Sequence, residues 1–135
     1  MPTGPDRRRM VKEPHAWILG ISLNDCGAGA SPLVVWEGSH EVLRAALREA
    51  FAGHAVASWG DVDVTEVYQA ARARVFATCR RVEVWSRVGE AILLHRLMLH
   101  GVAPWVNGAV APEEGRVIAY FRPLMGSVEA WVGKD

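Results

Sequence analysis

The sequence predicts a mainly β domain with two helices inserted among its strands. The first reason is the order of the patterns, because two strand-like segments come first, two helix-like segments follow, and about four strand-like segments complete the chain. The second reason is length, since 135 residues suit one domain with a single hydrophobic core. This order fits antiparallel strands with a helical excursion better than alternating β and α units.

The first two strands are expected after an irregular lead-in at residues 1–14, which is rich in proline and charge. Order should begin near His15. Over residues 16–23 the chain alternates with period two and both faces are apolar, as in a well-buried strand. Turn formers fill residues 24–31, and residues 32–36 (PLVVW) resume as a short strand. The two strands are therefore expected to form a hairpin.

Two helices are predicted around residues 40–78. Ser39 can cap the first helix, whose apolar side chains recur at helical spacing until Gly53 provides a stop. The second helix follows Asp63 and Glu66, which have the spacing of a capping box. A helical stripe of apolar residues continues from there.

The rest of the chain is predicted to be strands separated by turns, with a long loop between His100 and Arg116. The expected strands cover residues 82–85, 91–95, 116–122 and 130–132, and a further extended piece is expected at residues 97–100.

Charge and composition exclude several classes of partner. Fifteen basic residues balance fifteen acidic ones, so no overall field would attract nucleic acid or an anionic membrane. The arginines at positions 7–9 lack interleaved aromatic residues, which fits a solvated terminus better than a phosphate-binding arm. Apolar runs are far shorter than the ~20 residues needed to span a bilayer.

No apolar segment follows these arginines, so the sequence lacks the pattern of a secretory signal. Without export, Cys26 and Cys79 are expected to be reduced thiols, and no CxxC spacing suggests a zinc or redox site. We expect a cytoplasmic protein.

Five histidines are candidates for chemistry, although a neutral imidazole is more often a hydrogen-bonded structural residue than a metal ligand. His95 and His100 stand near the end of an apolar stretch, residues 89–101 (GEAILLHRLMLHG), and either could bind metal. His40 opens a helix and His54 lies in a linker, so we expect both to have structural or exposed positions.

Arg116 begins an apolar strand, where a buried guanidinium requires an anionic partner or several acceptors. The carboxylate of a ligand would suit its planar fork. An ion pair with Glu113 or Glu114, at the exit of the preceding loop, is an equally good alternative.

Two motifs, in this order, resemble the phytanoyl-CoA dioxygenase family. Residues 22–25 (SLND) followed by residues 31–40 (SPLVVWEGSH) are similar to a hairpin of that family that ends in a Gly-Ser-His turn. Residues 89–100 (GEAILLHRLMLH) are similar to the strand pair that leads to the family's second iron-binding histidine. The resemblance extends from His15 to about Arg122.

The resemblance implies a jelly roll, also called a double-stranded β-helix, of the cupin type over residues 15–135. It implies a non-haem Fe(II), 2-oxoglutarate-dependent oxygenase that hydroxylates a small organic substrate. His100 would be an iron ligand and Arg116 would bind the remote carboxylate of 2-oxoglutarate, while His95 would have a structural role near the site.

The family's other two iron ligands form a His-x-Asp or His-x-Glu pair before the first strand, and this sequence contains neither pair. Either the pair precedes Met1, so that the jelly roll is incomplete at its N-terminus, or the fold has lost its metal site. A substitute role for His15 is a weaker idea. In each case we expect weak activity or none from this sequence. The alternative function is a non-catalytic jelly-roll module that binds a carboxylate ligand or a protein partner.

Strand number predicts the state of assembly. A jelly roll closes with about eight strands, whereas this sequence supplies about six. Sheet edges should therefore be exposed and open to pairing. We expect a homodimer or a larger homo-oligomer, formed by edge pairing or by exchange of the N-terminal segment.

Overall fold

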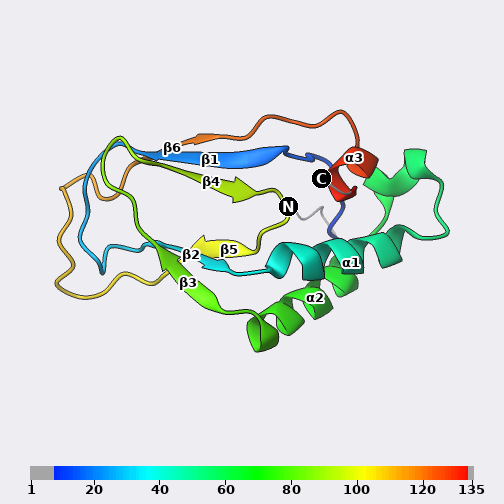
Figure 1. The fold of residues 1–135 in the computed structure, drawn as a ribbon, viewed down its shortest axis with the longest axis horizontal. Helices are drawn as coiled ribbons and strands as arrows, with labels where there is room; N and C mark the ends of the chain where they lie inside the picture. The colour runs from blue at the N-terminus through cyan, green and yellow to red at the C-terminus, as the bar shows by residue number, and fades with distance from the viewer. Residues whose placement is uncertain (1–7, 134–135) are drawn as a thin grey trace.

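The computed structural model describes residues 8–133 as two small antiparallel β-sheets that face each other, with the helices gathered at one end (Figure 1). One sheet has the strand order β4-β1-β6 and the other has the order β3-β2-β5. The described chain is therefore a mixed α and β structure with antiparallel sheets. Its strands are β1 (Trp17–Ser22), β2 (Leu33–Trp36), β3 (Arg81–Val84), β4 (Ala91–His95), β5 (His100–Val102) and β6 (Ile118–Phe121).

Alternate residues of β1 face the space between the two sheets. Ile18 is buried and belongs to a cluster with Leu94 of β4 and Val35 of the opposite sheet. Gly20 lies two residues further on and faces the same way, because side-chain directions repeat every two residues in a strand. The remaining members of this cluster are also apolar: Leu33, Val82, Val84, Ile92 and Met98.

A second, larger core holds the helices against one end of the sheets. Its helices are α1 (Ser39–Phe51), the 3₁₀ helix η1 (Val56–Asp61), α2 (Thr65–Thr78) and α3 (Val128–Val132). Leu47 and Phe51 of α1 are four residues apart, so they share a helix face, and both are almost fully buried. Val75 of α2 is fully buried in the same core.

The predicted hairpin between the first two strands is wrong. β1 pairs with β4 and β6, whereas β2 pairs with β3 and β5. Residues 23–32 connect β1 to β2 and cross from one sheet to the other, instead of making the two- to five-residue turn typical of a hairpin. β1 occupies the centre of its sheet, so each of its two edges is paired with a neighbouring strand.

Two predicted strands also need correction. Residues 130–132 belong to α3, where the Ser127 hydroxyl accepts a hydrogen bond from the Ala130 N–H at 3.1 Å. Residues 97–99 belong to no strand: a turn at residues 96–97, closed by a hydrogen bond from the Met98 N–H to the His95 carbonyl at 3.0 Å, is followed by β5, which begins only at His100.

Both predicted helix caps differ in detail. α1 is preceded by Gly38, whose φ of 77° suits glycine, and the buried Ser39 hydroxyl accepts a hydrogen bond from the Leu99 N–H instead of capping the helix. Asp63 accepts hydrogen bonds from the N–H and hydroxyl of Thr65, at 3.0 and 2.6 Å. It thus forms a turn ahead of α2, and no capping box with Glu66 is present.

The lead-in is anchored well before His15. Residues 1–7, which include the first of the three arginines, lie outside the described residues. The Arg9 N–H donates to the Thr65 hydroxyl at 2.7 Å, and its guanidinium lies 4.1 Å from the ring centroid of Tyr68. Val11 is buried in the helical core. The sequence prediction missed this order because one apolar residue gives no periodic signal.

Two other predictions can be compared with the structure. Cys26 and Cys79 are free thiols, as predicted. Among the described residues, no helix is both long enough and apolar enough to cross a membrane.

Candidate anion-binding site

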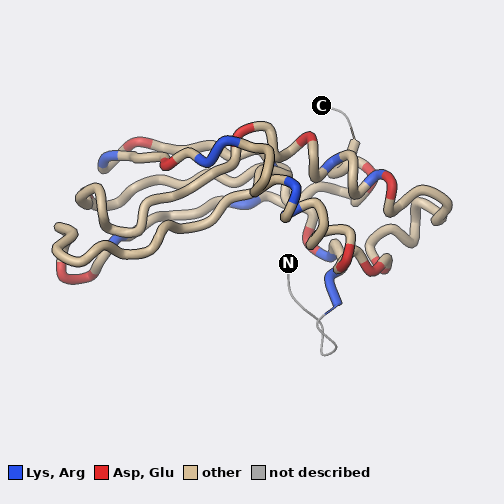
Figure 2. Tube along the Cα trace, turned by 90° about the horizontal axis from the view of Figure 1, so that it is seen from below, with Lys and Arg blue, Asp and Glu red and all other residues tan. Residues whose placement is uncertain are grey.

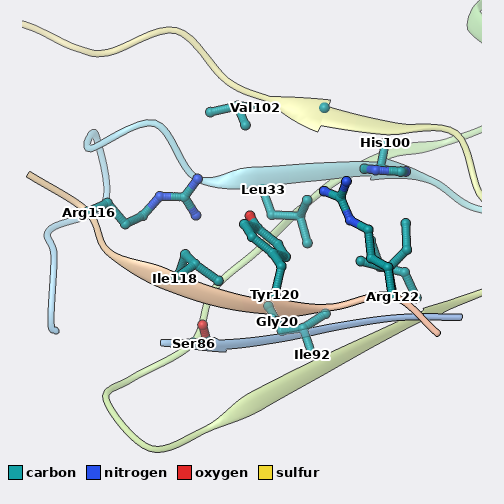
Figure 3. Close-up of a pocket in the computed structure, with 13 residues that line it drawn as sticks. Gly20, Leu33, Ser86, Ile92, His100, Val102, Arg116, Ile118, Tyr120 and Arg122 are labelled. Atoms are coloured by element: carbon teal, nitrogen blue, oxygen red, sulfur yellow. The ribbon is translucent and has the colours of Figure 1, made fainter. Parts of the chain in front are cut away.

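A pocket of about 220 Å³ lies between the two sheets (Figure 3). Most of its lining residues are aliphatic or glycine, five have polar side chains, and none of these described lining residues is acidic. The lining residues are Ile18, Gly20, Leu33, Ser86, Ile92, Leu94, His100, Gly101, Val102, Arg116, Ile118, Tyr120 and Arg122. The predicted site residues His100 and Arg116 are therefore brought together in one pocket.

One extended segment supplies three of the polar groups. Arg116, Ile118, Tyr120 and Arg122 are spaced two residues apart, so their side chains point to the same face of the segment. Figure 3 shows both guanidinium groups and the Tyr120 hydroxyl directed into the space between the sheets. The sequence analysis selected Arg116 and passed over Tyr120 and Arg122, although the alternation in RVIAYFR is the signal that identifies them.

The two guanidinium groups form no ion pair with an acidic residue of the described chain. Arg116 is half-buried, and Glu114, its alternative partner, instead accepts a hydrogen bond from the Asn24 amide at 3.3 Å. Arg122 is exposed, and its guanidinium carbon lies 5.3 Å from the ring centroid of Tyr120. Two positive charges therefore border an aliphatic pocket that contains no neutralising carboxylate.

His100 is held in a defined tautomer. Its Nδ1 lies 2.8 Å from the Met98 carbonyl oxygen. Because a carbonyl oxygen only accepts, Nδ1 carries the proton, and in the neutral ring Nε2 keeps a free lone pair. A backbone carbonyl bound to one ring nitrogen is also the arrangement that orients metal-binding histidines.

A second cavity of about 330 Å³ lies beside the first one, under the lead-in. The two cavities share Ile18, His100 and Arg122 in their linings. His15 also lines the second cavity, and its buried Nδ1 has no hydrogen-bond partner among the described residues. His100 and Arg122 thus border both spaces.

The other histidines have local roles. The Nδ1 of His95 accepts a hydrogen bond from the Leu97 N–H at 3.0 Å, which holds the turn before β5, and its ring lies 4.8 Å from that of His40. The Nε2 of His40 lies 3.3 Å from the Glu41 carboxylate. His54 is exposed in the linker after α1.

The residues described do not complete an iron site. Within residues 8–133, no group of three or more histidine, cysteine, aspartate or glutamate side chains is arranged to hold a metal ion. His100 is the single histidine that lines the pocket between the sheets. A 2-His-1-carboxylate site would require ligands in addition to His100.

Comparison of the chain with protein-family models, with curated proteins and with solved structures gives no match. The function must therefore be inferred from the geometry and chemistry of the pocket.

Proposed function

We propose that this chain is a jelly-roll module whose inter-sheet pocket binds a small carboxylate ligand of the 2-oxoglutarate class. The observation that supports this proposal is the pairing of Arg116 and Arg122 on one pocket wall with no acidic residue among the described lining residues. The Tyr120 hydroxyl between them adds a further hydrogen-bond donor.

The electrostatics of Arg116 favour an anion. A half-buried guanidinium loses part of its hydration, and a charge that is removed from water without a partner destabilises the fold. A carboxylate can accept two parallel hydrogen bonds from the planar fork, and each hydrogen bond to a charged group contributes about 1.5–3 kcal/mol. An anionic ligand would therefore supply the partner that the described residues do not.

The size and lining of the pocket favour a short ligand. Its volume of about 220 Å³ is below the 300–1,000 Å³ typical of sites for drug-sized molecules. Ile18, Ile92 and Ile118 offer an aliphatic surface to the methylene groups of such a ligand. Arg116 and Arg122 flank β6 at opposite ends, which suits a molecule with an anionic group at each end.

The path of the chain supports the jelly-roll proposal. The chain passes from one sheet to the other four times: between β1 and β2, β3 and β4, β4 and β5, and β5 and β6. Strands that alternate between two facing antiparallel sheets are typical of double-sheet jelly rolls.

A second candidate function is an Fe(II), 2-oxoglutarate-dependent oxygenase. The presence of His100 and Arg116 on one pocket favours it, as does the free Nε2 lone pair of His100. Because the described residues do not fit a complete iron site, we assign no catalytic step to this chain.

Calorimetric titration of the full chain with 2-oxoglutarate tests the binding proposal, with the uncharged dimethyl ester as the reference ligand. We expect the dicarboxylate alone to bind, and we expect Arg116→Ala to weaken binding by about tenfold or more, as loss of a charged hydrogen bond requires. Arg87→Ala is the matched control, because Arg87 is exposed and lies outside the pocket.

Equal affinity for the ester, or unchanged affinity in Arg116→Ala, would contradict the proposal. Formation of succinate from 2-oxoglutarate in the presence of Fe(II), lost in Arg116→Ala, would select the oxygenase instead. Binding without turnover would select the binding module.

A further inference from the structure

The sheet β4-β1-β6 has a second apolar face, directed away from the pocket. Leu19 of β1 stands opposite Leu93 of β4 and Phe121 of β6, so these three residues form a row across the sheet. Pocket-lining positions alternate with these residues along each strand, which places the row on the outer face. The same face carries the neighbouring row Ala91, Ile21 and Ala119, together with Trp17.

This outer face is both exposed and uncharged. Leu93 is 66% exposed, Phe121 is 51% exposed and Trp17 is 38% exposed. None of these seven residues is charged or polar apart from the indole nitrogen of Trp17, and the titratable group beside them is His95, which stands opposite Trp17 at the end of β4. By contrast, the outer side of the other sheet carries Arg81 and Glu83, which form an ion pair at 3.4 Å.

In the described part of the chain, no helix covers this face. Figure 1 shows the helices gathered at one end of the sheets, and none runs along the outer side of β4-β1-β6. Figure 2 shows the charged positions mainly in the loops and the helical end, with long uncharged runs along the strands. The alternation in residues 16–23 predicted a strand buried on both faces, but in the described chain only the inner face of β1 is covered.

We propose that the outer face of the β4-β1-β6 sheet binds the same face of a second copy of this chain. A face without charge meets its own copy without electrostatic repulsion, and a two-fold axis brings identical patches together. Facing sheets of two copies would pack about 10 Å apart, with strands nearly aligned, as in a β-sandwich.

The area of the face limits how much surface the proposed dimer could bury. The seven residues leave roughly 400 Å² open, within the range of the largest apolar patches on monomers. Two such faces would bury about 800 Å², which is below the roughly 1,000 Å² of a stable specific interface and within the range of weak, transient contacts. The dimer should therefore be weak and should dissociate reversibly on dilution.

Sedimentation equilibrium of the full chain over a wide concentration range tests this assignment. The unmodified chain is expected to shift from monomer to dimer as its concentration rises. Leu19→Lys and Leu93→Lys are expected to remain monomeric at concentrations at least tenfold above the dimerisation midpoint. Val110→Lys is the control, because Val110 is 76% exposed but lies in the loop before β6.

Leu19 distinguishes the proposed interface from edge pairing, because β1 is the central strand and has no free edge. A Leu19→Lys chain that dimerises like the unmodified chain would overturn the proposal, and so would an unmodified chain that stays monomeric throughout. Leu93→Lys controls for the possibility that Leu19→Lys fails to fold, because the Leu93 side chain is already mostly in solvent and its replacement should not disturb the fold. Recovery of the dimer on mixing Leu93→Lys with Leu93→Glu would support direct contact across the axis.

Discussion

At the residue scale, the proposed binding role of Arg116 follows from its position in the chain. Residue 116 is brought into the pocket by the two-residue period of the segment that continues into β6, and no carboxylate of the described chain neutralises it. Arg122 lies four residues after Ile118 on the same face of the segment; it is exposed, and its guanidinium lies over the ring of Tyr120. The half-buried arginine should therefore contribute more binding energy than the exposed one, since solvent screens an exposed charge.

Arg116→Lys should separate charge from geometry. Lysine keeps the positive charge but loses the planar fork that binds both carboxylate oxygens. We expect an affinity for 2-oxoglutarate between those of the unmodified chain and Arg116→Ala, measured by the same calorimetric titration. An affinity equal to that of the unmodified chain would mean that charge alone is recognised and that the fork is not used.

At the element scale, the start of α2 depends on one exposed carboxylate. Hydrogen bonds from the hydroxyl and then the N–H of Thr65 lower the pKa of Asp63 below its ordinary value of 3.8. A lowered folded-state pKa means that the carboxylate stabilises the fold above pH 3.8 and loses this effect as pH falls through the lowered value.

We expect Asp63→Ala to have a lower Tm than the unmodified chain at neutral pH, because the turn before α2 loses its acceptor. The difference in Tm should shrink as pH falls below 3.8. Thermal denaturation followed by circular dichroism across this pH range measures it. Asp61→Ala serves as a control for general loss of acidic charge, although it also removes the ion pair with Lys12. A difference that is constant with pH would exclude the carboxylate as the cause.

Local patterns predicted most elements of this fold but not their partners. The apolar spacing of α1 and the alternation of β1 depend on neighbours in sequence, so residues 39–51 and 17–22 could be identified as a helix and a strand. The pairing of β1 with β4 and β6 depends on contacts between distant residues, so the expected hairpin was wrong. Residues 130–132 are too few for either period to decide, and the Ser127 cap makes them helical.

For the candidate site, too, single residues could be predicted from the sequence but their spatial arrangement could not. His100 and Arg116 could be selected from sequence because imidazole and guanidinium groups stand out in apolar segments. Their common pocket could not, because it forms where two sheets from separate parts of the chain face each other.

At the scale of the whole molecule, the two proposals involve opposite faces of the β4-β1-β6 sheet. The inner face lines the pocket, and the outer face is the proposed dimer surface. Binding and assembly should therefore be independent of each other.

Leu93→Lys tests this independence. We expect the variant to bind 2-oxoglutarate with the affinity of the unmodified chain, because the side chain of Leu93 points away from the pocket. Calorimetric titration at a concentration where the unmodified chain is dimeric makes the comparison. A loss of affinity that accompanies loss of the dimer would show that the pocket depends on the second copy.

The central position of β1 also constrains the order of events during synthesis. β1 ends at Ser22, but its two neighbours are residues 91–95 and 118–121, so it emerges from the ribosome long before either is made. The helices α1 and α2 are translated in that interval and can pack on each other first. Until β4 and β6 arrive, β1 is an apolar strand with two unpaired edges, which is the kind of segment that promotes aggregation during folding.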